Sequence, residues 1–188
     1  GAADVAGSVA GSIEDSVDST VDLLTDEATV EETRAELDGM ATATLDRLFL
    51  EQPQAQDLYA QSVGHAIFDT RKLSVAGLAG GTGRGVAVSA EGARTYMRMG
   101  TAGVGLSFGI GGFETQVVLL FEDEAAFTEF VTLGLDATAD AGSMFGEESA
   151  SVGVQFVNGR AMFVLTKQGW KVSATAAGTK YWVDATLN

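Results

Sequence analysis

Few side chains in this sequence are of the types that carry out chemistry. The chain has no cysteine, which excludes disulfides, zinc–thiolate sites, iron–sulfur clusters and cysteine nucleophiles. His65 is the single histidine, so His-rich metal sites are excluded, although one histidine would suffice for a hydrolase of the Ser–His–Asp type. Because His65 lies among apolar neighbours, we expect it to have a structural role. We therefore expect no enzymatic activity and no cofactor.

A glycine-rich stretch over residues 80–85 raises the question of a phosphate-binding loop. It does not end in Gly-Lys-Ser/Thr as a P-loop does, and it precedes an expected strand, which excludes a dinucleotide fingerprint. Two interpretations stay open: a glycine turn, or backbone N–H groups that hold one phosphate together with Arg84. The acidic clusters at 122–124 and 147–148 lack EF-hand spacing. We interpret them as solvated or helix-capping acids and expect no metal site.

The charge of the chain is acidic but unevenly distributed. The formal net charge is -15, which argues against nucleic acid as a partner, because phosphate binding needs a basic surface. Residues 1–51 contain thirteen acids and two bases, and residues 99–148 contain nine acids and no base. Residues 71–98 reverse the sign. Their bases either form a lipid-headgroup site, if the fold brings them together, or pair with surface acids. These bases are Arg71, Lys72, Arg84, Arg94 and Arg98.

The elements that must position these side chains begin with an acidic segment. Residues 1–27 are rich in alanine, glycine, serine and aspartate. Apolar residues recur there at every fourth position, but glycines weaken a helix, so we predict an acidic tether or a marginal helix. The sequence begins at Gly1 without methionine, which indicates a trimmed start and leaves any leader or lipid anchor out of view. No apolar run approaches the ~20 residues of a membrane-spanning helix.

A helical hairpin is predicted next, over residues 28–70. Thr29 and Glu32 have the spacing of a capping box, which marks the start of the first helix. Pro53 suits the first position of the second helix. The apolar spacing predicts that this second helix continues past His65.

Beyond residue 72 the chain consists of short β-type runs separated by glycines. Nineteen of the 24 glycines lie there, a pattern typical of an antiparallel sheet or barrel. Asp123 is predicted to cap one inserted helix. Strands are predicted near 74–78, 85–89, 95–99, 104–110, 115–121, 150–157, 161–166, 170–176 and 180–183, with 135–141 as a further candidate. The predicted fold class is α+β: an antiparallel β-rich barrel or sandwich-like sheet, with N-terminal helices packed on it and one inserted helix.

One predicted strand has a nearly bare face. Large apolar residues alternate there with small ones over 103–111, and glycine inside a strand often marks close packing against it. A helix or barrel bend is one interpretation of what packs there, and a flat or lipid-like ligand is the other. The small residues of this face are Gly103, Gly105, Ser107 and Gly109. Three aromatic residues near the C-terminus, Trp170, Tyr181 and Trp182, are read either as core or as membrane-interface residues.

The order of several short motifs resembles the SYLF domain family of lipid-binding domains. The match covers roughly residues 40–185. By this resemblance we expect a single domain over residues 28–188, in which residues 71–188 form a β-rich body. Each motif is rich in glycine, alanine or valine, and their order and spacing carry the resemblance. The matching segments are 45–48 before Pro53, 64–68, 76–81, 83–88, 103–109, 117–121, 125–130, 134–139 and 167–173.

The resemblance implies a compact β-rich domain with flanking helices, no catalytic centre, and a bacterial member of the family. Eukaryotic relatives bind phosphoinositides, and a basic amphipathic N-terminal segment is important for their membrane contact, whereas this N-terminal segment is acidic. Bacterial relatives are often exported, some as lipoproteins, so we expect a periplasmic or outer-membrane-anchored protein.

Two functions stay open. The first is a lipid-binding or membrane-associated module of the cell envelope, with phospholipid or a membrane surface as partner. The alternative is a structural or protein-interaction domain of the envelope that does not recognise lipid.

Overall fold

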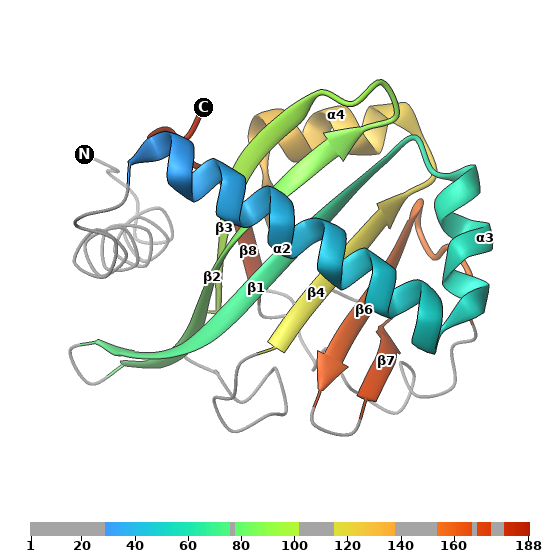
Figure 1. Ribbon diagram of the computed structural model, residues 1–188, viewed down its shortest axis with the longest axis horizontal. Coiled ribbons are helices and arrows are strands. Elements are labelled where there is room, and N and C mark those ends of the chain that lie inside the picture. Colours follow the sequence, from blue (N-terminus) through green and yellow to red (C-terminus); the bar gives the residue numbers. More distant parts are fainter. Residues whose placement is uncertain (1–28, 76–77, 102–114, 138–153, 167–168, 174–178) are drawn as a thin grey trace.

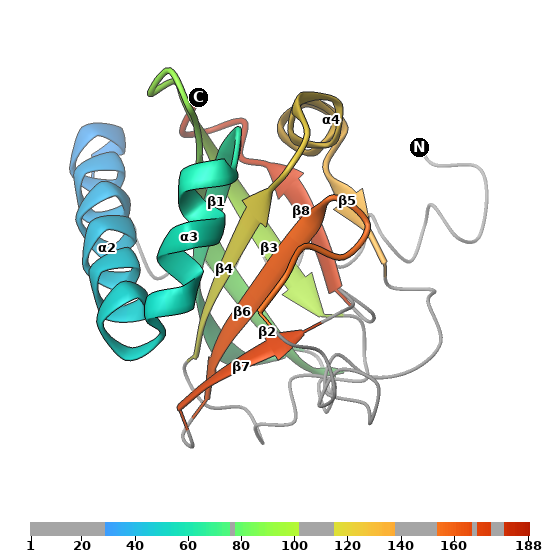
Figure 2. The ribbon, with the colours of Figure 1, turned by 90° about the vertical axis from the view of Figure 1, so that its right-hand side faces the viewer.

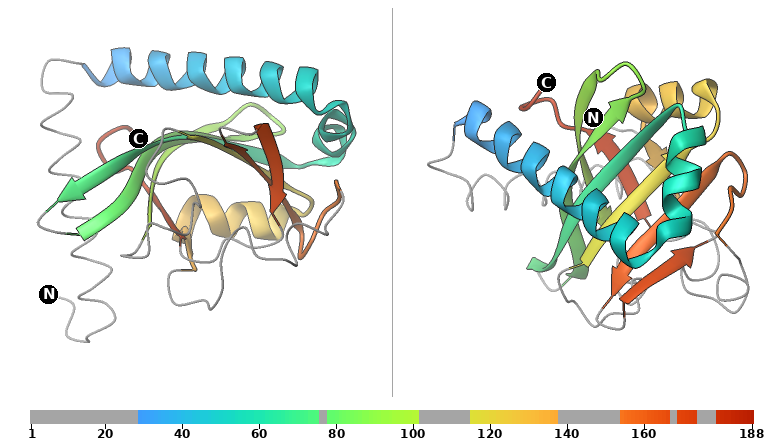
Figure 3. Two further views of the ribbon diagram at one scale, coloured as in Figure 1. Left: turned by 90° about the horizontal axis from the view of Figure 1, so that it is seen from below. Right: turned by 45° about the vertical axis from the view of Figure 1, so that its right-hand side comes forward.

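The fold is one curled antiparallel sheet with helices on both of its faces. The computed structural model describes residues 29–75, 78–101, 115–137, 154–166, 169–173 and 179–188 (Figure 1). Helices α2 and α3 lie on one side of the sheet, and α4 lies on the other (Figure 2). Seen from below, the sheet forms an arch with α2 outside it and α4 inside it (Figure 3). We call the two sides the convex and the concave face, respectively.

Eight strands and three helices make up the described part of this arrangement. All strand pairs are antiparallel, and the strand order is β5-β8-β3-β2-β1-β4-β6-β7. The predicted α+β class with a β-rich sheet is therefore confirmed, and the sheet resembles half of a barrel. The helices are α2 (Val30–Glu51), α3 (Pro53–Gln61) and α4 (Glu124–Leu133). The strands are β1 (Gly64–Val75), β2 (Leu78–Ser89), β3 (Arg94–Thr101), β4 (Thr115–Phe121), β5 (Leu135–Asp136), β6 (Arg160–Thr166), β7 (Gly169–Ser173) and β8 (Thr179–Val183).

The helix starts follow the predicted signals. The Thr29 hydroxyl accepts a hydrogen bond from the backbone N–H of Glu32, and the Glu32 carboxylate accepts one from the N–H of Thr29. Pro53 occupies the first turn of α3, and the Asp123 carboxylate accepts a hydrogen bond from the N–H of Ala126 in α4. Each cap satisfies donors that the first helical turn leaves unpaired. None of the described helices combines the length and apolar character required to cross a bilayer.

The predicted extent of the second helix is wrong. α3 ends at Gln61, and residues 64–70 belong to β1, which is hydrogen-bonded to β2 on one side and β4 on the other. His65 therefore lies in a central strand. The apolar run 65–68 fits a helix or a strand by periodicity alone, and pairing with two neighbouring strands decides the outcome. The predicted strand at 74–78 spans the end of β1 and the start of β2.

The remaining strand predictions differ mainly in length. β4 has the predicted bounds, and its residues Val117–Phe121 are buried on both faces, as expected. Of the candidate at 135–141, only Leu135–Asp136 is a strand among the described residues. Within 154–157 the structure shows a single bridge, from Val157 to Arg160, in place of a strand. Residues 103–111, including the predicted bare-faced strand, lie outside the described residues.

Each face of the sheet has its own apolar core. On the concave face, aromatic rings from the sheet and from α4 pack together at centroid distances of 4.9 to 6.3 Å. These rings belong to Phe68, Phe121, Phe127, Phe130 and Tyr181. On the convex face, α2 and α3 cover a second core centred on Ile67, Val86, Val118, Leu120 and Phe163.

A glycine in β2 makes room for the concave aromatic cluster. Gly85 lies opposite Phe68 in the β1–β2 register. A Cβ atom at Gly85 would collide with the Ile67 carbonyl oxygen and would lie 2.5 Å from a ring carbon of Phe68. The Phe68 ring therefore lies against bare backbone, which explains why a central strand tolerates glycine here.

Candidate functional site

Two of the predicted basic residues meet inside the molecule. Arg84 in β2 and Arg98 in β3 are direct cross-strand partners. The Arg98 Nε lies 2.7 Å from Oδ2 of Asp184, and the Arg84 Nε lies 3.9 Å from the same oxygen. The side chain of Arg98 is 3% exposed and that of Asp184 is 1% exposed. The predicted clustering of these two arginines is thus present, but around an internal carboxylate.

The carboxylate is fixed by the residues that follow β8. The backbone N–H of Asp184 donates to the carbonyl of Tyr96. Oδ1 of Asp184 accepts a hydrogen bond from the N–H of Thr186 at 2.9 Å, while Oδ2 faces Arg98. Both carboxylate oxygens are therefore engaged within the chain. Since a buried charge is costly unless it is paired, Arg98 acts as a structural ion-pair partner in this conformation.

Arg94, a third predicted residue, lies at the contact between the sheet and α2. Its side chain is 53% exposed, and its Nε lies 3.4 Å from Oδ1 of Asp38 in α2. The Tyr96 hydroxyl donates to the same carboxylate, at 3.1 Å from each oxygen. Burial, and then the Asp38 carboxylate, raise the pKa of Tyr96 above its usual value. Arg34, also in α2, donates to the Leu187 carbonyl at 2.6 Å, and its guanidinium lies 5.7 Å from the centre of the Tyr96 ring.

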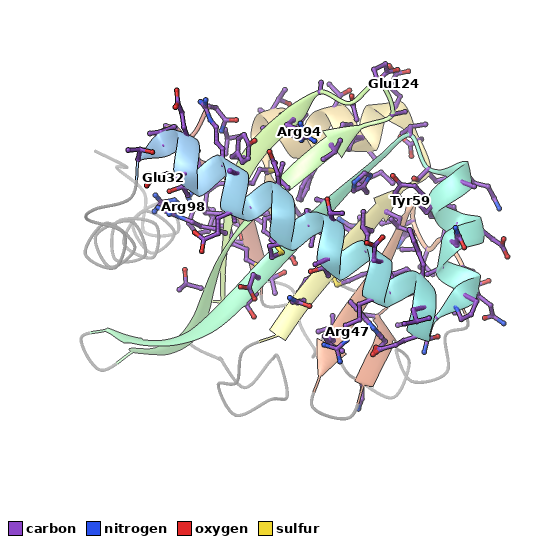
Figure 4. The ribbon with its side chains drawn as sticks, in the orientation of Figure 1. Glu32, Arg47, Tyr59, Arg94, Arg98 and Glu124 are labelled. Atoms are coloured by element: carbon purple, nitrogen blue, oxygen red, sulfur yellow. The ribbon has the colours of Figure 1, made fainter. Side chains whose placement is uncertain are left out.

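We call these five residues the α2 tie, because they join α2 to β3 and to the segment after β8. The tie consists of Arg34, Asp38, Arg94, Tyr96 and Leu187. Sequence reasoning missed it, because its members come from three distant segments. Figure 4 shows Arg94 and Arg98 on the α2 side of the sheet, with Arg47 and Tyr59 toward the other end of the helix layer.

The remaining predicted positions are not joined to this cluster by the described contacts. Arg71 and Lys72 lie in β1, opposite Thr82 and Gly81 of β2; their side chains lie outside the description. The predicted close-packing face, Gly103 to Gly109, also lies outside the described residues. Sequence reasoning missed one pattern in this segment. Gly105, Ser107 and Gly109 have the Gly-x-Ser-x-Gly spacing that is typical of hydrolase nucleophile turns.

His65 lies on the convex face, packed against α3. Its ring centroid lies 5.0 Å from that of Tyr59, which in turn lies 5.1 Å from that of Phe49. Burial lowers the pKa of His65 to about 4, so the imidazole is neutral near pH 7. This environment supports the structural role expected for His65.

The three C-terminal aromatic residues have different environments. Tyr181 is fully buried in the concave core, and burial raises its pKa to about 12. Trp182 is half-buried, and the Lys180 ammonium lies 5.8 Å from the centre of its ring. Trp170 is half-buried beside the end of α2, where its indole N–H donates to Glu51 at 3.1 Å. Of the two interpretations of these residues, core or membrane interface, Tyr181 thus fits the core.

The face that α2 turns to the sheet combines apolar and polar residues. The residues that α2 buries include two leucines and one alanine, and the other two are threonines. The hydroxyls of those threonines donate to carbonyls of the helix itself, Thr33 to Thr29 and Thr44 to Met40. The sheet residues beneath are larger and fully buried, as for Ile67 and Phe163. Met40, Leu45 and Phe49 of α2 are partly buried against the same core, so the cover of the convex face is apolar as well.

Comparison with known proteins finds an informative similarity. No protein-family model matches the chain. Over 158 residues, which is 84% of this chain, the sequence is 42% identical to the Beta cell expansion factor A of Aeromonas veronii. The chain spans 59% of the length of that relative.

Proposed function

We propose that the chain is a non-enzymatic lipid-binding or membrane-associated module of the SYLF type, acting in the bacterial cell envelope. The order of glycine-rich motifs supports the family assignment, and the similarity to a bacterial protein, the Beta cell expansion factor A of Aeromonas veronii, accords with a bacterial member. The buried, neutral His65 gives no support to a hydrolase.

The observation that carries the proposal is the convex face of the sheet. Ile67, Val86, Val118, Leu120 and Phe163 form a continuous apolar surface without exposed area. α2 covers this surface with two buried leucines and an alanine, and with the partly buried Met40, Leu45 and Phe49. Apolar surface of this kind has a favourable free energy of contact with acyl chains, because the hydrophobic effect scales with the apolar area removed from water.

The alternative, a protein-interaction domain of the envelope, is favoured by the outer surface of α2. Five exposed acids lie on that helix and would repel an anionic bilayer. They are Glu31, Glu32, Glu36, Asp46 and Glu51. A protein partner with a basic surface would instead find a complementary charge there.

Co-flotation with liposomes separates the two functions. The purified chain is mixed with vesicles of phosphatidylcholine alone, or with added phosphatidylglycerol, cardiolipin or phosphoinositide, at low and moderate salt. The lipid-binding module is expected to float with at least one of these vesicle types, and binding through basic side chains is expected to weaken with salt. A chain that floats with none of them would refute the proposal and favour a protein partner.

A further inference from the structure

The hairpin of β1 and β2 extends beyond the rest of the sheet. β1 pairs with β4 only over residues 64–70, and β2 pairs with β3 only over residues 82–88. The pairing between β1 and β2 continues past these points to Val75 and Leu78. We call residues 71–75 and 78–81 the arm. At about 3.3 Å per residue, the arm reaches about 16 Å beyond the sheet, and it points away from α2 and α3 (Figures 1 and 3).

The root of the arm is fixed in the folded body. Thr70 and Thr82, which flank the arm, are 2% and 5% exposed. The Thr82 hydroxyl donates to the Met99 carbonyl at 3.4 Å. A Cβ atom at Gly83 would lie 2.6 Å from the Asp69 carbonyl oxygen, so the two strands are closely packed where they leave the sheet. Because a ribbon of two strands is only marginally stable in water, the arm gains stability from this root and from any surface that its residues contact.

The charge of this hairpin is opposite to that of the chain as a whole. Residues 70–90 contain three bases and no acid, in a chain with 26 acids. The bases are Arg71, Lys72 and Arg84, and the first two of them begin the arm at its root. A local excess of bases attracts anionic headgroups even where the net charge of the protein is negative, because the interaction falls off within a Debye length.

Apolar residues follow the bases toward the end of the arm. Val75 and Leu78 are cross-strand partners there, and Leu73 lies opposite Gly80. Residues two apart along a strand share a face, so Leu73 and Val75 belong to the face of β1 that carries Ile67 of the convex core. The order from root to end is therefore basic and then apolar. A segment that enters an anionic bilayer meets headgroups and then acyl chains in the same order.

We propose that the arm is the membrane-binding element of the chain: its apolar end enters an anionic bilayer, and Arg71 and Lys72 contact the headgroups. This inference rests on the proposed lipid-binding function and names the element that performs it. Among the described strands, neither edge of the arm has a further neighbour. Since unpaired backbone groups are costly in hydrocarbon, the arm enters only the boundary of headgroups and acyl chains, to a depth of about 5–10 Å.

A pair of matched double variants tests the arm. Leu73→Ser with Leu78→Ser removes two leucines from the arm. Leu50→Ser with Leu133→Ser is the control, because these two leucines are each 82% exposed and lie at the ends of α2 and α4. Co-flotation with phosphatidylcholine–phosphatidylglycerol vesicles measures binding, and circular dichroism compares the folded state of the variants.

The arm variant is expected to bind these vesicles about tenfold more weakly or less, because its leucines no longer gain from leaving water. The control should bind as the unmodified chain does. Equal binding by both variants and the unmodified chain would overturn the arm and leave the lipid-binding function standing. If the arm variant instead lost self-association in light scattering while its vesicle binding was unchanged, the arm would be a contact between copies of the chain. Absence of binding by the unmodified chain would refute the function and the inference with it.

A fluorescent probe tests the same inference with the leucines of the arm in place. The chain contains no cysteine, so Val75→Cys carries a single environment-sensitive nitrobenzoxadiazole label at the end of the arm. Gln56→Cys is the control, because Gln56 is exposed on α3, away from the arm. On addition of the same vesicles, the label at position 75 should shift to shorter wavelength and brighten several-fold, whereas the label at position 56 should not. Vesicle binding without a change at position 75 would contradict insertion of the arm.

Discussion

Replacing Arg98 by methionine removes one partner of the buried ion pair while keeping a long, unbranched side chain. Asp184 then retains the Thr186 N–H on one oxygen, and Arg84 stays 3.9 Å from the other. The reciprocal variant, Asp184→Asn, keeps an acceptor for Thr186. It takes the negative charge away from two adjacent guanidinium groups, Arg84 and Arg98. The two variants therefore leave different charges behind in the same place.

The expected losses of stability follow from those charges. Removing one partner of a buried pair costs about 3–5 kcal/mol, because the remaining charge is left desolvated. Arg84 partly compensates Asp184 in the first variant, so Arg98→Met should cost about 3 kcal/mol, at the lower end of that range. Asp184→Asn leaves two neighbouring like charges without this anion and should cost about 5 kcal/mol. Either loss is large for a domain with a total stability of about 5–15 kcal/mol.

Urea unfolding followed by circular dichroism measures both free energies of unfolding. Arg47→Met is the control, because Arg47 makes the same kind of contact with Glu51 on the exposed side of α2. Its loss should cost no more than about 0.5 kcal/mol. The reasoning fails if Arg98→Met costs less than the control, or if it costs more than Asp184→Asn.

Three further predictions concern the core, the histidine and the basic strand end. Gly85→Ala should destabilise the chain by about 2 kcal/mol or more, since the added methyl group collides with a ring and a carbonyl. Gly39→Ala, which meets open space in an exposed helix, should stabilise it by about 1 kcal/mol; thermal unfolding compares the two. His65 has a folded pKa of about 4, below its unfolded value near 6.5, so the unfolded state binds its proton first. Stability should therefore fall by up to about 3 kcal/mol as pH drops from about 6.5 to 4. His65→Phe should reduce this slope in urea titrations, and an unchanged slope would contradict the assigned burial. Finally, Arg71→Glu with Lys72→Glu should weaken the salt-sensitive part of vesicle binding in co-flotation, whereas salt-sensitive binding that survives both reversals would exclude these positions as headgroup contacts.

The sequence predicted the helix starts correctly, because a helix start is determined by capping residues within one helical turn. The capping box of Thr29 and Glu32, and the carboxylate of Asp123, fixed the starts of α2 and α4, because a cap satisfies donors within one helical turn. The boundary between α3 and β1 was not predictable in this way. Its position depends on pairing of residues 64–70 with β2 and β4, and these partners lie far away in the sequence.

The charged residues of the candidate site show the same limit of prediction from local sequence. Counting bases over 71–98 identified Arg84, Arg94 and Arg98 as a group. It did not reveal that Arg98 is buried against Asp184, because the two residues are 86 positions apart and only the β3–β8 pairing brings them together. A charge count cannot distinguish a surface cation from a buried one. The contacts of Asp38 with Tyr96 and Arg94 could not be predicted from the sequence for the same reason.

The two covers of the sheet differ in a way that connects these findings. α4 contributes phenylalanine rings to a tight aromatic cluster on the concave face, so lifting it would expose large apolar surfaces of both partners. α2 buries two leucines, an alanine and two threonines, and it packs the partly buried Met40, Leu45 and Phe49 against the convex core. The two faces of the sheet are thus closed by different kinds of contact: packed aromatic rings on the concave face, and apolar packing with polar contacts at both ends of α2 on the convex face.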